Sequence, residues 1–180
     1  MESVSLITNS TNSVSGGTMT HIGKEVNKDL NTELLQFVSF NLGDEEYAIE
    51  ILKVQEIIRM IDITRVPNSP EFINGVINLR GRVLPVLDLG KRIGLPEKEH
   101  SGDSRIIVVE INNIVIGFIV DKVNIVLRIN QGIVEPTPEL VGNVNSEFIS
   151  GIAKMEKNLL ILLDLDKVIT LPEIEKLSAK

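Results

Sequence analysis

An internal repeat is the feature that most constrains the fold. Residues 37–60 align with 106–129 at a shift of 69, and residues 72–96 align with 148–172 at a shift of 76. The difference of 7 between the shifts predicts a longer loop in the second copy, around Pro136-Thr137-Pro138. Because solenoids need three or more repeats, two copies predict two small units that pack together. In the second alignment 11 of 25 positions are identical, counted from the first copy as Phe72, Ile73, Gly75, Leu84, Leu87, Asp88, Leu89, Lys91, Ile93, Leu95 and Pro96.

Alternating apolar and polar residues predict β-strands in both copies. The expected strands are 36–42, 47–51, 54–60, 74–79 and 83–87 in the first copy, and 105–111, 114–120, 123–129, 150–155 and 159–163 in the second. We therefore expect an all-β fold of two β-barrel subdomains over 34–100 and 101–172. We expect them to pack together, since each is too small to be very stable by itself. Asp88 and Asp164 are expected to cap short helical turns, and 173–180 to form a short helical tail.

The remaining sequence limits the class of protein. Residues 1–33 are small and polar without a period, which predicts a flexible tail. The net charge of −7 disfavours a nucleic-acid partner, because phosphate backbones bind cationic surfaces. The sequence shows no secretory signal and no apolar run long enough to span a bilayer. We therefore expect a cytoplasmic protein without direct membrane insertion.

Catalytic and metal-binding patterns are missing from the sequence. The two histidines, His21 and His100, fall in the tail and in the polar linker 97–103, where we expect no fixed geometry for proton transfer. Asp164 and Asp166 would need further ligands to hold a metal ion, so capping is the preferred role. We predict a protein that is not an enzyme and has no cofactor or metal, although a facing pair of carboxylates is left open.

Two differences between the copies indicate a partner site. Arg80 and Arg82 lie in a predicted hairpin turn, where the second copy has Glu156 and Asn158. Glu56 corresponds to Ile125, so either the first copy exposes this face or Glu56 meets a cation, with Arg80 the expected neighbour. The alternative for the two arginines is a solubilising turn charge of little energetic effect.

Four stretches carry a resemblance to a known family: 42–49, 51–58, 72–81 and 84–89. Together they make residues 37–171 similar to the chemotaxis coupling protein (CheW) family. The resemblance implies one domain over 34–172, made of two SH3-like five-stranded β-barrels packed face to face. It also implies a non-enzymatic scaffold that links transmembrane chemoreceptors to the chemotaxis histidine kinase, in arrays at the inner face of the membrane. The implied partners are the regulatory domain of the kinase and the cytoplasmic hairpin of the receptor.

The resemblance also implies roles for single residues. The positions of Val54, Glu56 and Arg80 are associated with partner binding, and that of Gly75 with coupling to the kinase. A buried-backbone role explains a glycine at 75 equally well, and the repeat partner Val123 indicates core packing for Val54.

A different class of function also stays open. Small β-barrels commonly bind small ligands or nucleic acids. The acidic charge and an aromatic content of 3% oppose this alternative, because single-stranded nucleic acids stack on aromatic side chains. An enzyme is the third and least favoured hypothesis.

Overall fold

The computed structural model describes residues 33–137 and 145–178. The predicted tail at 1–33, apart from Glu33, lies outside these residues, as does most of the predicted loop insertion after Thr137. The first copy contains β1 (Leu34–Leu42), β2 (Glu45–Glu50), the 3-10 turn η1 (Ile51–Lys53), β3 (Val54–Arg59), β4 (Ile73–Leu79), β5 (Arg82–Asp88) and α1 (Leu89–Arg92). The second contains β6 (Arg105–Ile111), β7 (Ile114–Val120), β8 (Lys122–Asn130), η2 (Gln131–Ile133), β9 (Val134–Glu135), η3 (Ser146–Phe148), β10 (Ile149–Lys154), β11 (Leu159–Leu163), α2 (Leu165–Val168) and α3 (Leu171–Ser178).

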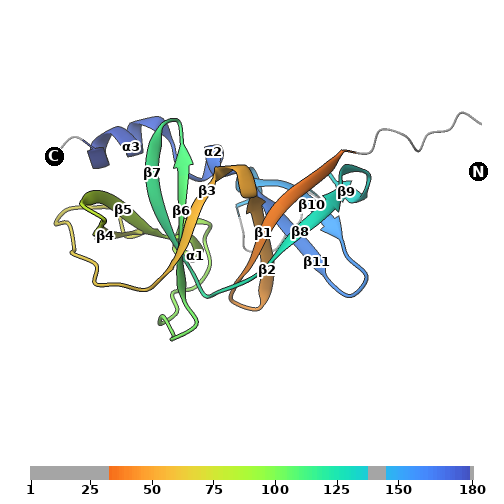
Figure 1. Cartoon of the computed structure of the whole chain (residues 1–180), viewed down its shortest axis with the longest axis horizontal. Coiled ribbons are helices and arrows are strands. Elements are labelled where there is room, and N and C mark those ends of the chain that lie inside the picture. Colours follow the sequence, from red (N-terminus) through yellow and green to blue (C-terminus); the bar gives the residue numbers. More distant parts are fainter. Residues whose placement is uncertain (1–32, 138–144, 179–180) are drawn as a thin grey trace, which may run out of the picture. The chain divides into compact units, whose positions relative to one another are not determined.

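The strands form two sheets, and each sheet combines both copies of the repeat. One has the order β8-β1-β2-β11-β10-β9 and the other β3-β6-β7-β5-β4. In Figure 1 the orange β1 and β2 accordingly belong to the same sheet as the blue β10 and β11. The copies join through the parallel pairs β2 with β11 and β5 with β7 and through the antiparallel pairs β1 with β8 and β3 with β6. The first hairpin of each copy thus completes the sheet of the other.

This exchange corrects the expected subdomain limits of 34–100 and 101–172. Strands β1 and β2 lie within the first range but belong to the sheet of β8 to β11, and β6 and β7 are exchanged in the opposite direction. The physical reason is that equivalent hairpins carry equivalent apolar faces. Either hairpin can therefore complete either sheet.

A central apolar cluster joins the two sheets. It contains buried residues of both, including Phe40 and Tyr47 from β1 and β2, Phe118 from β7 and Leu163 from β11. The predicted shared apolar surface is therefore present. Among the described residues, 23 buried side chains form this cluster and take one apolar face of each sheet out of water. Burial of apolar surface is the dominant stabilising effect in folding.

Each sheet also surrounds a smaller cluster on its other face. Phe37 lies in one of these clusters, while the next residue, Val38, lies in the central cluster. Successive side chains of a strand point to opposite faces, so one strand supplies both cores. Ile77 and Ile106 belong to the corresponding small cluster of the five-stranded sheet.

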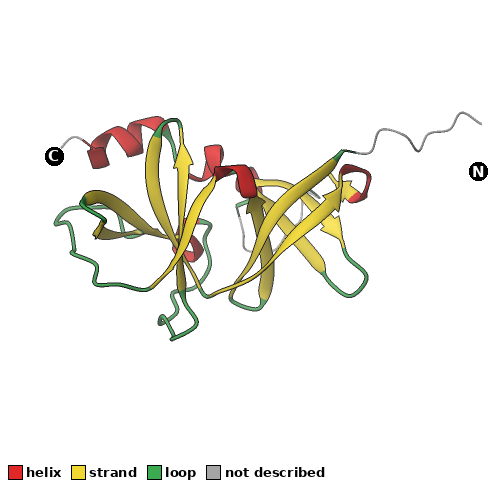
Figure 2. Ribbon diagram, in the orientation of Figure 1, coloured by secondary structure: helices red, strands yellow, loops and turns green. Residues whose placement is uncertain are grey.

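The helices are short (Figure 2). Helices α1 and α2 follow Asp88 and Asp164 as predicted, whereas α3 begins at Leu171, two residues before the predicted start at 173. Asp88 caps α1 by accepting a hydrogen bond from Lys91 N, and Asp164 caps α2 by accepting one from Asp166 N. Helix α3 has Pro172 in its first turn, a position that tolerates the missing N–H group. No helix in the described residues is long and apolar enough to cross a membrane.

Candidate functional site

The β4–β5 hairpin places Arg80 at an unusual backbone conformation. Leu79 pairs with Arg82, so Arg80 and Gly81 alone form the turn. Their φ angles are +52° and +83°, and Asn78 Oδ1 accepts a hydrogen bond from Gly81 N at 2.9 Å. Two-residue turns with positive φ at both positions fit the twist of a hairpin but favour Asn, Asp and Gly. Arginine is not one of these residues, so the turn itself does not explain why Arg80 occupies its first position.

Arg80 forms a two-pronged ion pair with Glu56. Nη1 donates to Oε1 at 3.0 Å and Nη2 donates to Oε2 at 2.7 Å. The contact connects the β4–β5 turn to β3, and β3 and β4 are the two edge strands of the sheet. The predicted Arg80–Glu56 pair is confirmed. The arginine side chain stays 77% exposed, so the pair orients a cation at the surface instead of burying it.

Val54 lies two residues before Glu56 on β3, with a β-bulge between them. Val54 pairs with Val109 of the central cluster and Glu56 with Val108 of the small cluster, so the two side chains lie on opposite faces. The side chain of Val54 is half-buried and packs against the central cluster, as does that of its repeat partner Val123. The core-packing role indicated by the repeat is therefore present. A role of Val54 in binding a partner stays a prediction.

Gly75 is buried in β4 and holds a neighbouring segment close. Its φ is +144°, and a Cβ atom built there would lie 2.1 Å from the carbonyl oxygen of Thr64. Thr64 exchanges two backbone hydrogen bonds with Val76, at 2.8 and 2.9 Å. Only glycine allows this approach, so the structural explanation of Gly75 holds, and its role in kinase coupling stays a prediction.

Apolar side chains are exposed beside the ion pair in the sequence. Val83, three residues after Arg80, is 69% exposed, and Ile57 follows Glu56 and is 40% exposed. Arginine and exposed apolar side chains are both common in protein interfaces, but Ile57 and Glu56 are adjacent on β3 and point to opposite faces of the strand. The described residues contain no group of three or more acidic or histidine side chains placed to hold a metal ion.

Comparisons with known proteins identify the family. The model of the CheW-like domain matches residues 36–173. The chain belongs to the CheW family. Relatives include the chemotaxis protein CheW of Helicobacter pylori, 39% identical over 139 residues, which are 77% of this chain and 84% of the relative. The CheW of Bacillus subtilis is 39% identical over 134 residues, 74% of this chain and 86% of the relative.

A solved structure of a CheW protein has the same fold. The crystal structure of the scaffolding protein TtCheW from Thermoanaerobacter tengcongensis superposes with a TM-score of 0.72 at 39% identity, over 78% of this chain and 96% of that one. The resemblance proposed from the sequence and the two SH3-like subdomains are confirmed. The chain is a non-catalytic scaffold of chemotaxis, which replaces the alternative of a ligand- or nucleic-acid-binding barrel.

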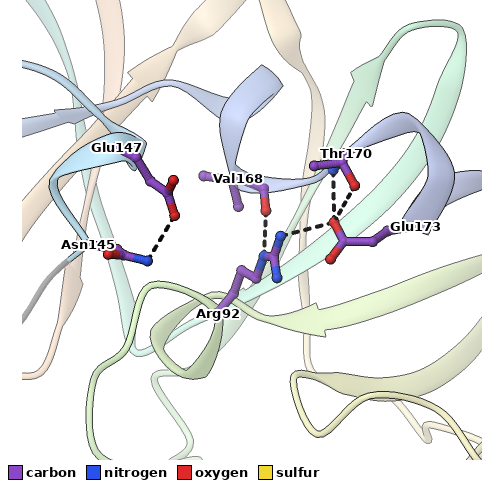
Figure 3. A network of polar contacts seen from close by, with 6 residues as sticks. All are labelled: Arg92, Asn145, Glu147, Val168, Thr170 and Glu173. Carbon is purple, nitrogen blue, oxygen red and sulfur yellow. Dashed lines mark hydrogen bonds and ion pairs between the residues drawn. The ribbon is translucent and has the colours of Figure 1, made fainter.

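A second polar network of this CheW chain was not predicted. Arg92 Nε donates to Val168 O at 2.5 Å, and Nη2 donates to Glu173 Oε2 at 2.9 Å (Figure 3). The guanidinium also lies 4.4 Å from the ring centre of Phe72 and 5.5 Å from that of Phe148. Phe72 and Phe148 are repeat partners, as are Arg92 and Val168. The difference between arginine and valine at matching positions is the signal that could have indicated the network.

The expectation for His100 is also corrected. We expected this histidine in a loose linker, but its Nε2 lies 3.9 Å from Asp88 Oδ2 and 3.5 Å from Asn74 Nδ2. It lines a cavity that also contains buried apolar residues of β1 and β7. The polar composition of 97–103 does not indicate this position, because contacts with residues distant in sequence leave no local periodic pattern of apolar residues.

Proposed function

We propose that this CheW-family scaffold links the cytoplasmic hairpin of transmembrane chemoreceptors to the regulatory domain of the chemotaxis histidine kinase. It acts in the cytoplasm, recruited to receptor arrays at the inner face of the membrane. The observation that supports a specific contact is the Arg80–Glu56 pair, which the second copy lacks. An ion pair at this exposure contributes only about 0–1 kcal/mol to folding, so its value is the orientation of Arg80.

The proposed binding site centres on Arg80, whose guanidinium Glu56 holds at the surface. Arginine is a frequent interface hot spot, because its planar guanidinium makes several hydrogen bonds and also packs against apolar groups. Glu56 holds two of the donor groups and leaves the rest of the guanidinium free for a partner. Val54 on β3 and Gly75 on β4 are the further residues proposed to take part in partner binding.

A pull-down with kinase and receptor fragments tests the proposal. Arg80→Glu is expected to abolish complex formation with one of the two fragments while leaving the melting temperature nearly unchanged. Arg82→Glu is the matched control, since it makes the same charge change in the same hairpin, and we expect it to keep binding. Loss of the fold in Arg80→Glu, or equal loss of binding in both variants, would contradict the proposed contact.

A charge exchange separates the orientation of Arg80 from direct contact. The double variant Arg80→Glu with Glu56→Arg restores an ion pair but moves the cation to β3. If Arg80 itself touches the partner, binding stays lost in the double variant although stability returns. Recovery of full binding would show that only the intramolecular pair matters.

A further inference from the structure

The internal duplication allows the partners of the two capping aspartates to be compared within one chain. In the second copy, Asp164 Oδ2 lies 3.4 Å from Nζ of Lys167, a side chain that stays charged at neutral pH. Its repeat partner Lys91 pairs Nζ with a different carboxylate. Asp88 Oδ2 faces His100 instead, whose Nε2 lies 3.9 Å away. The first copy thus has a side chain that can titrate where the second has a fixed positive charge.

The imidazole of His100 has two neighbours that require opposite states of its Nε2 atom. The side-chain amide of Asn74 on β4 places Nδ2, a donor, 3.5 Å from Nε2. Nε2 can accept from this group only when the ring is neutral and carries its proton on Nδ1. The carboxylate of Asp88 only accepts, so it can bond to Nε2 only when this nitrogen is protonated. At 3.9 Å the second contact is beyond hydrogen-bonding distance, so the observed geometry fits the neutral ring.

The side chains of loop 97–103 reach both sheets. Its histidine lies beside Asp88, at the end of β5 in the five-stranded sheet. Lys98 Nζ lies 3.3 Å from Asp121 Oδ2, and the same oxygen accepts a hydrogen bond at 2.9 Å from the backbone N–H of Gly43. Gly43 belongs to the turn between β1 and β2 of the six-stranded sheet. A hydrogen bond at the histidine would therefore connect this loop to both sheets at once.

Two cavities meet at this loop, and carboxylates outnumber permanent cations in both. Their volumes are about 450 and about 770 Å³, and both are lined by Asp88, Glu97, Lys98 and His100. The further charged residues of the first, from the β1–β2 hairpin and the residue after β7, are Asp44, Glu45 and Asp121. Those of the second, from α1, the loop itself and the segment before β4, are Lys91, Glu99, Arg65 and Glu71. A positive charge on the imidazole is therefore added to an acidic part of the surface, where the carboxylates attract it.

We propose that His100 is a pH-dependent switch that fastens loop 97–103 to the end of β5. When the ring is neutral, it accepts from Asn74, and the loop is held by its ion pairs. When Nε2 is protonated, it gives up that contact and donates a charge-assisted hydrogen bond to Asp88 Oδ2, which draws the loop onto β5. The inference goes beyond the proposed function and does not depend on it, since Arg80 lies at the opposite end of β5.

The test is NMR of the full chain carrying His21→Gln, which leaves His100 as the one histidine in the sequence. The imidazole nitrogen signals report which ring nitrogen carries a proton, and in the neutral ring we expect it on Nδ1. The amides of Leu95 and Ser104 make backbone hydrogen bonds of 2.9 and 3.1 Å on either side of the histidine, so their exchange reports release of the loop. After correction for the intrinsic rate, we expect their protection to be at least about threefold higher near pH 6 than near pH 8.

Variants of the two partners separate the switch from a general effect of pH. His100→Gln cannot change its charge, so its protection is expected to be the same at both pH values. His100→Lys supplies a permanent cation, as in the second copy, and is expected to show the higher protection at both. Asparagine is as good a helix cap as aspartate, so Asp88→Asn is expected to fold and to lose the pH dependence. The matched variant Asp164→Asn is expected to keep it.

Three results would overturn the inference. They are protection that does not change with pH in the parent chain, the same pH dependence in His100→Gln or Asp88→Asn as in the parent, and a neutral ring with its proton on Nε2. Arg80→Glu is expected to keep the switch, so failure here and failure of the proposed function give different results.

Discussion

Arg80 combines a disfavoured backbone with an exposed charge. A non-glycine residue in the left-handed region is uncommon and costs on the order of 1 kcal/mol. The ion pair to Glu56 offsets part of this cost, but a turn with asparagine and no pair would be about as stable. Strained residues often occur at functional sites, which agrees with a binding role for this side chain.

Replacing Arg80 by asparagine separates folding from binding. Asparagine tolerates positive φ, so we expect Arg80→Asn to change the free energy of unfolding by less than about 1 kcal/mol in either direction. Partner binding is expected to be lost with the guanidinium. Urea unfolding and a pull-down on the same sample check both statements, and a large fall in the urea midpoint would show that the arginine is structural.

For Gly75 we expect the reverse, namely that its replacement destabilises the fold. In Gly75→Ala the new Cβ would meet the Thr64 carbonyl oxygen at 2.1 Å, at a φ of +144°. We expect a loss of more than about 2 kcal/mol of unfolding free energy, as for other strained backbone positions. Gly102→Ala is the control, because nothing lies within 4 Å of a Cβ atom there. If Gly75→Ala is as stable as the control, the fold does not require the glycine.

At the scale of the elements, the carboxylate of Glu173 links helix α3 to the rest of the domain. Glu173 Oε2 accepts hydrogen bonds from Thr170 N at 2.9 Å and Thr170 Oγ1 at 2.8 Å, as well as from Arg92. Partial burial alone would raise the pKa of Glu173, but the hydrogen bonds from Thr170 and the charge of Arg92 outweigh it and lower the pKa below its usual 4.5. The ionised carboxylate therefore ties α3 to α1.

This attachment is expected to weaken in acid. Because the folded pKa of Glu173 is below the unfolded one, its contribution is complete above pH 4.5 and is lost as the pH falls through the lowered value. Hydrogen exchange of the α3 amides should show lower protection in Glu173→Gln than in the wild type at pH 7. The two proteins should converge in acid. A constant difference at all pH values would exclude the charge as the cause.

Most elements could be predicted because they follow local patterns. The expected strand 105–111 coincides with β6, and Asp88 and Asp164 cap their helices as expected. The Arg80–Glu56 pair could be found because a repeat exposes positions where one copy departs from the other. The position of His100 beside Asp88 was missed, because a polar loop carries no pattern that indicates which distant residues it lies against.

For the whole molecule, the exchange of hairpins was beyond sequence reasoning. Pairing β1 and β2 with either set of strands buries the same alternating residues, so the hydrophobic pattern does not distinguish the two arrangements. The exchange makes the cores interdependent. Phe37 and Val38, adjacent in the first copy, serve the small cluster of the six-stranded sheet and the central cluster respectively.

A cavity in one core should therefore destabilise both sheets. Ile106 is fully buried in the small cluster of the five-stranded sheet. Ile106→Ala is expected to lower the unfolding free energy by about 2–5 kcal/mol, in one transition. Calorimetry should show a single peak, and hydrogen exchange should speed up equally in β6 and in β11. Two separate transitions would mean that the sheets fold independently.

The loop 97–103 connects the two copies in sequence, but it is not what keeps them together. Each copy has strands built into both sheets. A protease that cut this loop would leave two polypeptides in one folded particle, which would migrate as a single species until denatured. Their cohesion comes from strand pairing and the common core, and the intact peptide chain is needed only to bring them together.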